Sequence, residues 1–425
     1  MRGKAITSKV SSGITPRLSP SALLLCVFAL SRPLSLLYRE SGLGGLNLLE
    51  LFAIGISYVM ILVIIMNIRR FPFDPVSLVS ILFCVFCVGT IAAGSVIQSV
   101  AKTVLPFIIF FAVRCAITTR KEIKGILIVL FVGYIYPIVG SLVLIAKGES
   151  VGRVMYESGI EKFQGMFFRI HSFAHAMTFF SYVTAAVLVM IKPKKKIVKA
   201  LLLFLLAASV FCLFKSAVRT TLVGFLIFWT VYLAGTNRKY LVLLLCTVIA
   251  GTFIYSSQIK TLIWMTSSSP TALSEKTLDK ASTGRFTIWT HNLSVFTDLP
   301  FERKFIGVGL GNENKRLSYE DEVAYSSHND YITLLMTSGI IGLGLYLLIL
   351  LFLLIDIIKS KIDKPVKYLF IAVLIAVAAM NGLSNSYINR FELGQLFWLF
   401  IGIFYVLNDI SRQRELYEPV STAKV

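Results

Sequence analysis

The feature that most constrains this chain is a series of long apolar runs. Hydrophobic side chains make up 56% of the 425 residues, and they gather in runs that recur along the whole chain. A helix of about 20 apolar residues crosses a hydrocarbon core about 30 Å thick, and it satisfies its own backbone hydrogen bonds there. Membrane-spanning strands would be shorter and alternating, whereas these runs do not alternate. The sequence therefore predicts an all-α integral membrane protein.

Each run that is long and apolar enough is predicted as one membrane-spanning helix. The twelve predicted spans are residues 20–38, 47–67, 76–100, 103–118, 124–146, 172–191, 199–215, 219–236, 239–257, 329–357, 366–384 and 392–408. Basic residues gather between alternate spans, as in 192–199 and 359–367, and cytoplasmic loops are the ones enriched in Lys and Arg. We therefore expect both termini in the cytoplasm. The first apolar run lacks a small-residue cleavage site, so we interpret it as a retained helix.

One long hydrophilic stretch, residues 258–328, interrupts the apolar pattern. It holds eight basic and eight acidic residues, and charge alternation places it on the outer face of the membrane. We expect a single membrane domain with nine helices in 1–257, an outer catalytic loop in 258–328, three helices in 329–409 and a cytoplasmic tail in 410–425.

The net charge of +20 does not indicate a nucleic-acid-binding protein. The basic residues occur in small groups between apolar runs, which is the pattern of membrane topology, and net charge alone carries little specificity. We therefore expect no nucleic-acid partner. The six cysteines lie in or beside apolar runs and are interpreted as small buried hydrophobic residues.

Some basic residues fall on the predicted outer face, where topology does not account for them. Arg153 and Arg169 lie in the loop 147–171, and Lys215 and Arg219 lie at the outer edge of adjacent spans. Arg219 is either an arginine that extends to the interface or a phosphate ligand, because its planar fork matches phosphate oxygens. Together these residues indicate an anionic ligand.

Arg285 and Trp289 lie four residues apart in the polar stretch, so on a helix they share one face. One interpretation is an amphipathic helix on the bilayer, with Trp289 as its interfacial anchor. The other is that Arg285 holds a phosphate. Gly307, Gly309 and Gly311 follow without a βαβ unit, so we predict a tight turn rather than a dinucleotide site.

His328 ends the polar stretch, directly before an apolar run. An unperturbed imidazole has a pKa near 6.5, which suits proton abstraction around neutral pH. Asn329, which follows it, is a candidate helix cap. His171 and His175 are spaced to face one metal ion, but no third ligand stands in a recognisable frame. We therefore expect no metal and no other cofactor.

Four segments together resemble the O-antigen ligase and Wzy polymerase family. SHNDYITLLMTSGIIGL at 327–343 resembles its H-N-x-Y-L-x-x-L…G-x-x-G-L signature, and 284–309 resembles the preceding G-R-x-x-x-W…G-x-G segment. Residues 216–220 (SAVRT) resemble the S-x-S-R helix edge, although Ala and Val depart from it. Residues 171–174 resemble a looser segment that here lacks its proline.

The resemblance implies a GT-C-type glycosyltransferase of the bacterial inner membrane with its active site facing the periplasm. Such an enzyme takes a glycan from an undecaprenyl pyrophosphate carrier and is metal-independent. A polymerase adds the glycan to another carrier-linked glycan, and a ligase adds it to lipid A–core. The shared motifs do not separate the two, and we lean towards a polymerase. Further expected partners are membrane lipid and a chain-length regulator protein.

The resemblance and the chemistry together assign roles to individual residues. Arg219 and Arg285 would stabilise the charge that develops on the leaving pyrophosphate, and His328 would deprotonate the acceptor in an inverting displacement. The expected substrate contacts are Arg153, Arg169, Lys215, Trp289, Asn329 and Tyr331. A lipid-linked oligosaccharide flippase is the more distant alternative, but no inverted repeat of the kind common in transporters is visible.

Overall fold

The structure is a computed structural model of the full chain. It describes residues 18–35, 42–43, 46–149, 153–155, 161–167, 169–254, 284–312, 327–384, 387–388 and 390–417. Most of the predicted outer loop, including 258–283 and 313–326, lies outside the described residues.

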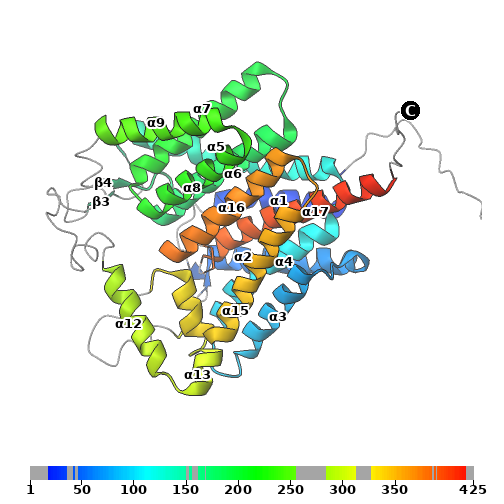
Figure 1. Cartoon of the computed structure of the whole chain (residues 1–425), viewed down its shortest axis with the longest axis vertical. Helices are drawn as coiled ribbons and strands as arrows, with labels where there is room; N and C mark the ends of the chain where they lie inside the picture. The colour runs from blue at the N-terminus through cyan, green and yellow to red at the C-terminus, as the bar shows by residue number, and fades with distance from the viewer. Residues whose placement is uncertain are drawn as a thin grey trace, which may run out of the picture.

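The described residues form a bundle of helices, and a helix lies over each of the twelve predicted segments (Figure 1). The helices are α1 (Pro20–Ser35), α2 (Leu48–Met66), α3 (Pro75–Gly89), α4 (Ile97–Ala116), α5 (Arg120–Ala146), α6 (Ile170–Ala186), α7 (Lys196–Ser216), α8 (Arg219–Thr236), α9 (Arg238–Ile254), α15 (Asp330–Lys359), α16 (Lys364–Leu383) and α17 (Phe391–Tyr417). Among the described residues, seven helices are long and apolar enough to cross a membrane. The chain is therefore an all-α, multi-pass membrane protein in its coarse architecture.

The interior of the bundle is built around α17 and α6. Nearly every described side chain of α17 from Leu393 to Leu407 is buried, and so is α6 from Ser172 to Val187. Outer helices instead expose apolar side chains, such as Leu82 on α3 and Leu351 on α15. This distribution is that of a bundle whose outer surface faces lipid, where exposed apolar side chains carry no cost.

The predicted third span, 76–100, is shorter in the structure. α3 ends at Gly89 and a turn precedes α4, which begins at Ile97. Thr90 donates its hydroxyl to the Cys87 carbonyl over 2.6 Å, and Gly94 has φ +98°. Local hydrogen bonding by Thr and a left-handed Gly end a helix, so this part of the apolar run is a turn.

Two short hairpins interrupt the predicted loops. β1 (Gly42–Leu43) pairs with β2 (Leu46–Asn47), and β3 (Arg153–Met155) pairs with β4 (Glu161–Phe163), both antiparallel. The second hairpin lies in the predicted outer loop 147–171, and Figure 1 shows it at the side of the bundle where α8 and α9 lie, with α12 (Arg285–Asp298) drawn below it. The sequence predicted a loop there, without strands.

The three closely spaced glycines form a docked turn after α13 (Phe301–Ile306). Gly339 interrupts α15 with φ +65° and ψ −168°, and the backbone N–H groups of Val308 and Gly309 donate to the Met336 and Thr337 carbonyls beside that break. On the other side of the glycine turn, the Leu310 backbone N–H donates to the Ser95 hydroxyl, and the Val96 backbone N–H donates to the Leu310 carbonyl. The predicted tight turn is present, and it joins α15 to the α3–α4 connection.

Candidate functional site

The site is organised at the carboxyl end of α16. The Arg285 guanidinium donates from Nη1 to the Leu383 carbonyl over 2.6 Å, and the Asn329 amide donates from Nδ2 to the Gly382 carbonyl over 2.7 Å. The last carbonyls of a helix have no partner within it and carry partial negative charge. They therefore draw α12 and the start of α15, which are far apart in sequence, to the same place.

His328 is held in an uncommon backbone conformation at this place. Its φ is +48°, the left-handed region that non-glycine residues rarely occupy outside functional sites. The residues on both sides are fixed: the Trp289 indole donates to the Ser327 carbonyl over 2.7 Å, and the Ser327 hydroxyl bonds to Asn329 and Thr333. The half-buried His328 imidazole is thereby positioned by neighbours that leave its backbone little freedom.

Asn329 is the helix cap that the sequence analysis considered. Its side-chain oxygen accepts from the backbone N–H groups of Tyr331 and Ile332 at 3.0 and 3.1 Å. Asp330 accepts from the Ile388 backbone N–H over 3.1 Å, which ties α15 to the segment before α17. These two side chains therefore fix the position of His328 from the carboxyl-terminal side.

Arg219 arrives from a third element, as the first residue of α8. A left-handed turn at Ala217 (φ +52°) separates α7 from α8, and α8 packs closely along α16 where Gly224 faces Met380. The two helices are antiparallel neighbours, because α8 begins where α16 ends. Burial and the nearby Arg219 both lower the pKa of Arg285, so the two guanidinium groups lie close enough to act on each other.

Electrostatics favours the neutral form of the His328 imidazole. Burial, Arg285 and Arg390 lower the pKa of His328 from its ordinary value of 6.5. A neutral imidazole has a free nitrogen that can accept a proton. At neutral pH His328 is thus in the form that a general base requires.

Two further cations lie beside these residues, and the sequence analysis did not place them in the site. Lys162 on β4 is buried, and burial together with Arg219 and Arg285 lowers its pKa to about 8. Arg390, just before α17, has its pKa lowered by burial and raised by Glu392, and it donates to the Ser172 hydroxyl over 3.5 Å. Both residues lie in segments that are predicted on the outer face. A basic residue in such a segment was the sequence signal that could have marked them as candidate ligands of an anion.

Lys162, Arg219, Arg285 and Arg390 are called the cationic cluster below. The charge of each member shifts the pKa of another titratable group of this region, or its own pKa is shifted by such a group. Cations gathered at partly buried positions repel one another, and an anion placed among them relieves that repulsion. The cluster is therefore suited to bind a ligand with more than one negative charge.

The other residues that were predicted to contact the substrates have different surroundings. Lys215 is exposed at the end of α7, with its ammonium 5.8 Å from the Phe163 ring of β4. Arg169 is exposed directly before α6 and acts electrostatically on Arg390. The Tyr331 hydroxyl donates to the Ala378 carbonyl over 2.9 Å and so joins α15 to α16. The Arg153 side chain lies outside the described residues.

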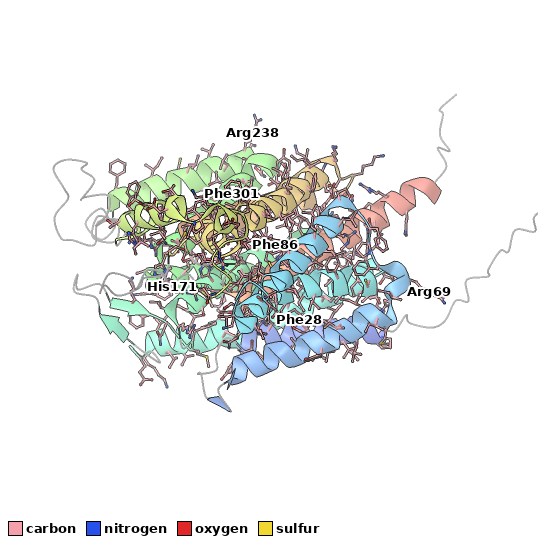
Figure 2. The ribbon with its side chains drawn as sticks, turned by 90° about the horizontal axis from the view of Figure 1, so that it is seen from below. Phe28, Arg69, Phe86, His171, Arg238 and Phe301 are labelled. Carbon is pink, nitrogen blue, oxygen red and sulfur yellow. The ribbon has the colours of Figure 1, made fainter. Side chains whose placement is uncertain are left out.

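The two histidines of α6 have different surroundings. His171 lies in the first turn, where Arg390, Arg285, Lys162 and His328 all act on it electrostatically. His175 is fully buried one turn further on and packs edge-on to the Tyr387 ring, with ring centroids 6.0 Å apart. Figure 2 shows His171 towards one end of the helices and Arg69 at the opposite end.

Residues 201–347, about a third of the chain, match the family model described as O-antigen ligase. Over this segment the chain is similar to the O-antigen ligase family. The matched O-antigen ligase segment contains Arg219, Arg285 and His328, so the resemblance stated from motifs is confirmed there. The family consists of membrane glycosyltransferase-like ligases and polymerases. A search of curated proteins found no match to the chain.

Proposed function

We propose that this protein transfers a glycan from an undecaprenyl pyrophosphate carrier to an acceptor sugar at the periplasmic face of the bacterial inner membrane. The observation that carries the proposal is the convergence of Arg219, Arg285 and His328, from α8, α12 and the start of α15, at the end of α16. Cations that suit a diphosphate thus lie beside a neutral base.

The cationic cluster would act on the leaving group. As the glycosidic bond breaks, negative charge grows on the pyrophosphate, and fixed cations stabilise that charge more in the transition state than in the ground state. Arg219 and Arg285 present planar donor forks that match phosphate oxygens. The hydrogen bond from Arg285 to Leu383 holds its guanidinium in place before the donor arrives, which is the preorganisation this mechanism needs.

His328 would take the proton from the acceptor hydroxyl as that oxygen attacks the anomeric carbon. Pyrophosphate is a good leaving group, so one base suffices and no metal or other cofactor is required. A single displacement inverts the anomeric centre. Trp289 and Asn329 position His328, and Arg153, Arg169, Lys215 and Tyr331 are retained as proposed contacts of the substrates.

The proposed topology has twelve spans, cytoplasmic termini and the 258–328 loop in the periplasm. Basic residues at the end of the bundle opposite to His328 support it, since Arg69, Arg70, Arg120, Lys192 and Lys364 all lie at helix ends there. The domain division of 1–257, 258–328, 329–409 and 410–425 follows from the same topology. A chain-length regulator remains a proposed partner.

The acceptor separates the two finer functions. We propose a polymerase, whose acceptor is another carrier-linked glycan, with lipid A–core as the acceptor in the ligase alternative. A strain that lacks the gene would lose long glycan chains in the first case and would lose the capping of the core in the second.

Transfer by the purified protein in detergent tests the catalytic proposal directly. Carrier-linked donor and acceptor are mixed with the protein without any sealed membrane, and product is measured. We expect product with the wild-type protein and none with heat-inactivated protein. A protein that moves donor across vesicles but forms no product in detergent would instead be a transporter, and the proposal would fail.

A further inference from the structure

A pocket lies at the end of the bundle opposite to the cationic cluster. It encloses about 250 Å³ and is formed by the start of α5, the last residues before Lys192, the start of α16 and the end of α17. α6 begins beside His328 and continues through residues 187–191 to the pocket. α17 begins at Phe391, next to Arg390, and reaches the pocket at Ser411. Twenty residues of helix span about 30 Å, so a membrane thickness separates the two sites.

The mouth of the pocket is basic. Arg120, Lys124 and Lys192 line it, with Asp363 as the acidic lining residue. Lys192 and Asp363 approach to 3.8 Å, but both side chains are 70% exposed, so this ion pair contributes little. Arg120 donates to Ser411 over 3.4 Å, and a hydroxyl does not neutralise its charge. The positive charge at the mouth therefore exceeds the negative charge.

The inner wall of the pocket is apolar. Ile123 and Val366 are buried beneath the basic residues, and Met190 is half-buried beside them. The segment that supplies Met190 is a single π-helical turn, Val187–Ile191, which ends at a left-handed Lys192. π-helical turns occur frequently at functional sites. Here the turn supplies Val189, Met190 and Ile191 to the lining of the pocket.

We propose that this pocket binds the head group of an anionic phospholipid, with the first carbons of its acyl chains against the apolar wall. A basic pocket between helices at the membrane interface matches a phosphate ester in charge, and the adjoining apolar wall matches the lipid chain. A free phosphate would use the cations and leave Ile123, Met190 and Val366 without a partner. The pocket is independent of the transfer site, so the proposal does not rest on the proposed function.

Native mass spectrometry of the detergent-solubilised protein tests this. The probe is phosphatidylglycerol, compared with phosphatidylethanolamine of the same acyl chains. We expect the wild-type protein to bind phosphatidylglycerol at least tenfold more tightly. The variant Arg120→Gln/Lys124→Gln/Lys192→Gln should bind it roughly a hundredfold more weakly than the wild type, since each interfacial cation contributes about a fivefold factor.

Two further variants keep the test decisive. Lys194→Gln/Lys195→Gln/Lys196→Gln removes the same charge from exposed residues that do not line the pocket, and it should bind phosphatidylglycerol as the wild type does. Met190→Trp keeps the charge and fills the apolar wall, and it should weaken binding at least tenfold. Equal loss in the matched control, no effect of Met190→Trp, or displacement of the lipid by equimolar inorganic phosphate would each overturn the proposal.

Discussion

At the scale of single residues, His328 combines a strained backbone, a half-buried side chain and two arginines nearby, Arg285 and Arg390. The left-handed φ of +48° is stabilised by the Trp289–Ser327 hydrogen bond and by the Asn329 cap. A non-glycine residue that the surrounding structure holds in a left-handed backbone conformation indicates that the position of its side chain, here the imidazole, matters for function.

His328→Ala should reduce transfer by about 10²–10⁴-fold, because a positioned general base contributes that much to a rate. Donor binding should remain close to that of the wild type, since the cationic cluster is intact. The measurements are transfer in detergent and donor affinity of the same preparation. His291→Ala alters an exposed histidine of α12 and should leave both unchanged. Wild-type transfer by His328→Ala would refute the assignment.

Arg219→Lys and Arg285→Lys should each lower transfer by about 10²–10³-fold, the usual cost of removing one transition-state donor. A lysine keeps the charge but loses the planar fork that binds two phosphate oxygens. The comparison is Arg238→Lys, an exposed residue at the start of α9, which should be neutral. Full activity in either cluster variant would mean that the fork geometry is not used.

The pH dependence of kcat/KM should be bell-shaped. On the acid side, activity should rise as pH increases through the pKa of His328, which burial and two arginines hold below 6.5, because only the neutral imidazole accepts a proton. On the alkaline side, activity should fall through about pH 8, where Lys162 loses its charge and donor attraction weakens. Lys162→Met should lower kcat/KM and remove the alkaline limb, and an unchanged limb would exclude Lys162.

At the scale of elements, the break in α15 organises the face that bears the site. Gly339 frees the Met336 and Thr337 carbonyls, which accept from the 308–309 backbone. A Cβ at Gly339 would clash with the Phe305 carbonyl oxygen. The glycine thus permits α13 to dock, and α13 follows α12, the helix that carries Arg285, after the short connection Leu299–Pro300.

Gly339→Ala should lower stability by roughly 2 kcal/mol, because its φ and ψ lie in a region that essentially only glycine occupies. Transfer should fall with it as α12 loses its support. Thermal unfolding in detergent and transfer at a temperature where both proteins are folded measure the two effects. Gly344→Ala, on the same helix with nothing within 4 Å of the new Cβ, should be neutral. Equal effects of the two substitutions would contradict this account.

At the scale of the whole molecule, the two ends of the bundle have different chemistry. One end gathers the cationic cluster and His328, and the other carries the basic pocket and the basic helix ends. If the first end faces the periplasm, a cysteine at position 300, in place of exposed Pro300, should react with a membrane-impermeant maleimide in intact cells whose outer membrane is permeabilised. A cysteine in place of exposed Lys195 should react only after lysis. The reverse result would invert the proposed topology.

Local sequence accounts for most of the elements of this bundle. Apolar length predicted where twelve of the described helices lie, and the motif segments predicted the similarity of residues 201–347 to the O-antigen ligase family, because both signals are written in consecutive residues. Apolar length did not predict α12 and α13, which lie in the polar stretch. The sequence missed the early end of α3 at Gly89 and the β3–β4 hairpin. Those depend on a threonine hydroxyl bond and on backbone pairing within a loop, which apolar length does not report.

The sequence by itself determined that this protein is a bundle of membrane helices with Arg219, Arg285 and His328 as its candidate chemical groups. Only the tertiary structure decided that they meet, because the meeting place is the carboxyl end of α16, whose free carbonyls attract Arg285 and Asn329. It also added Lys162 and Arg390, which no motif marks. Helix ends interact through space with partners from any part of the chain, so their neighbours follow from packing and not from residue order.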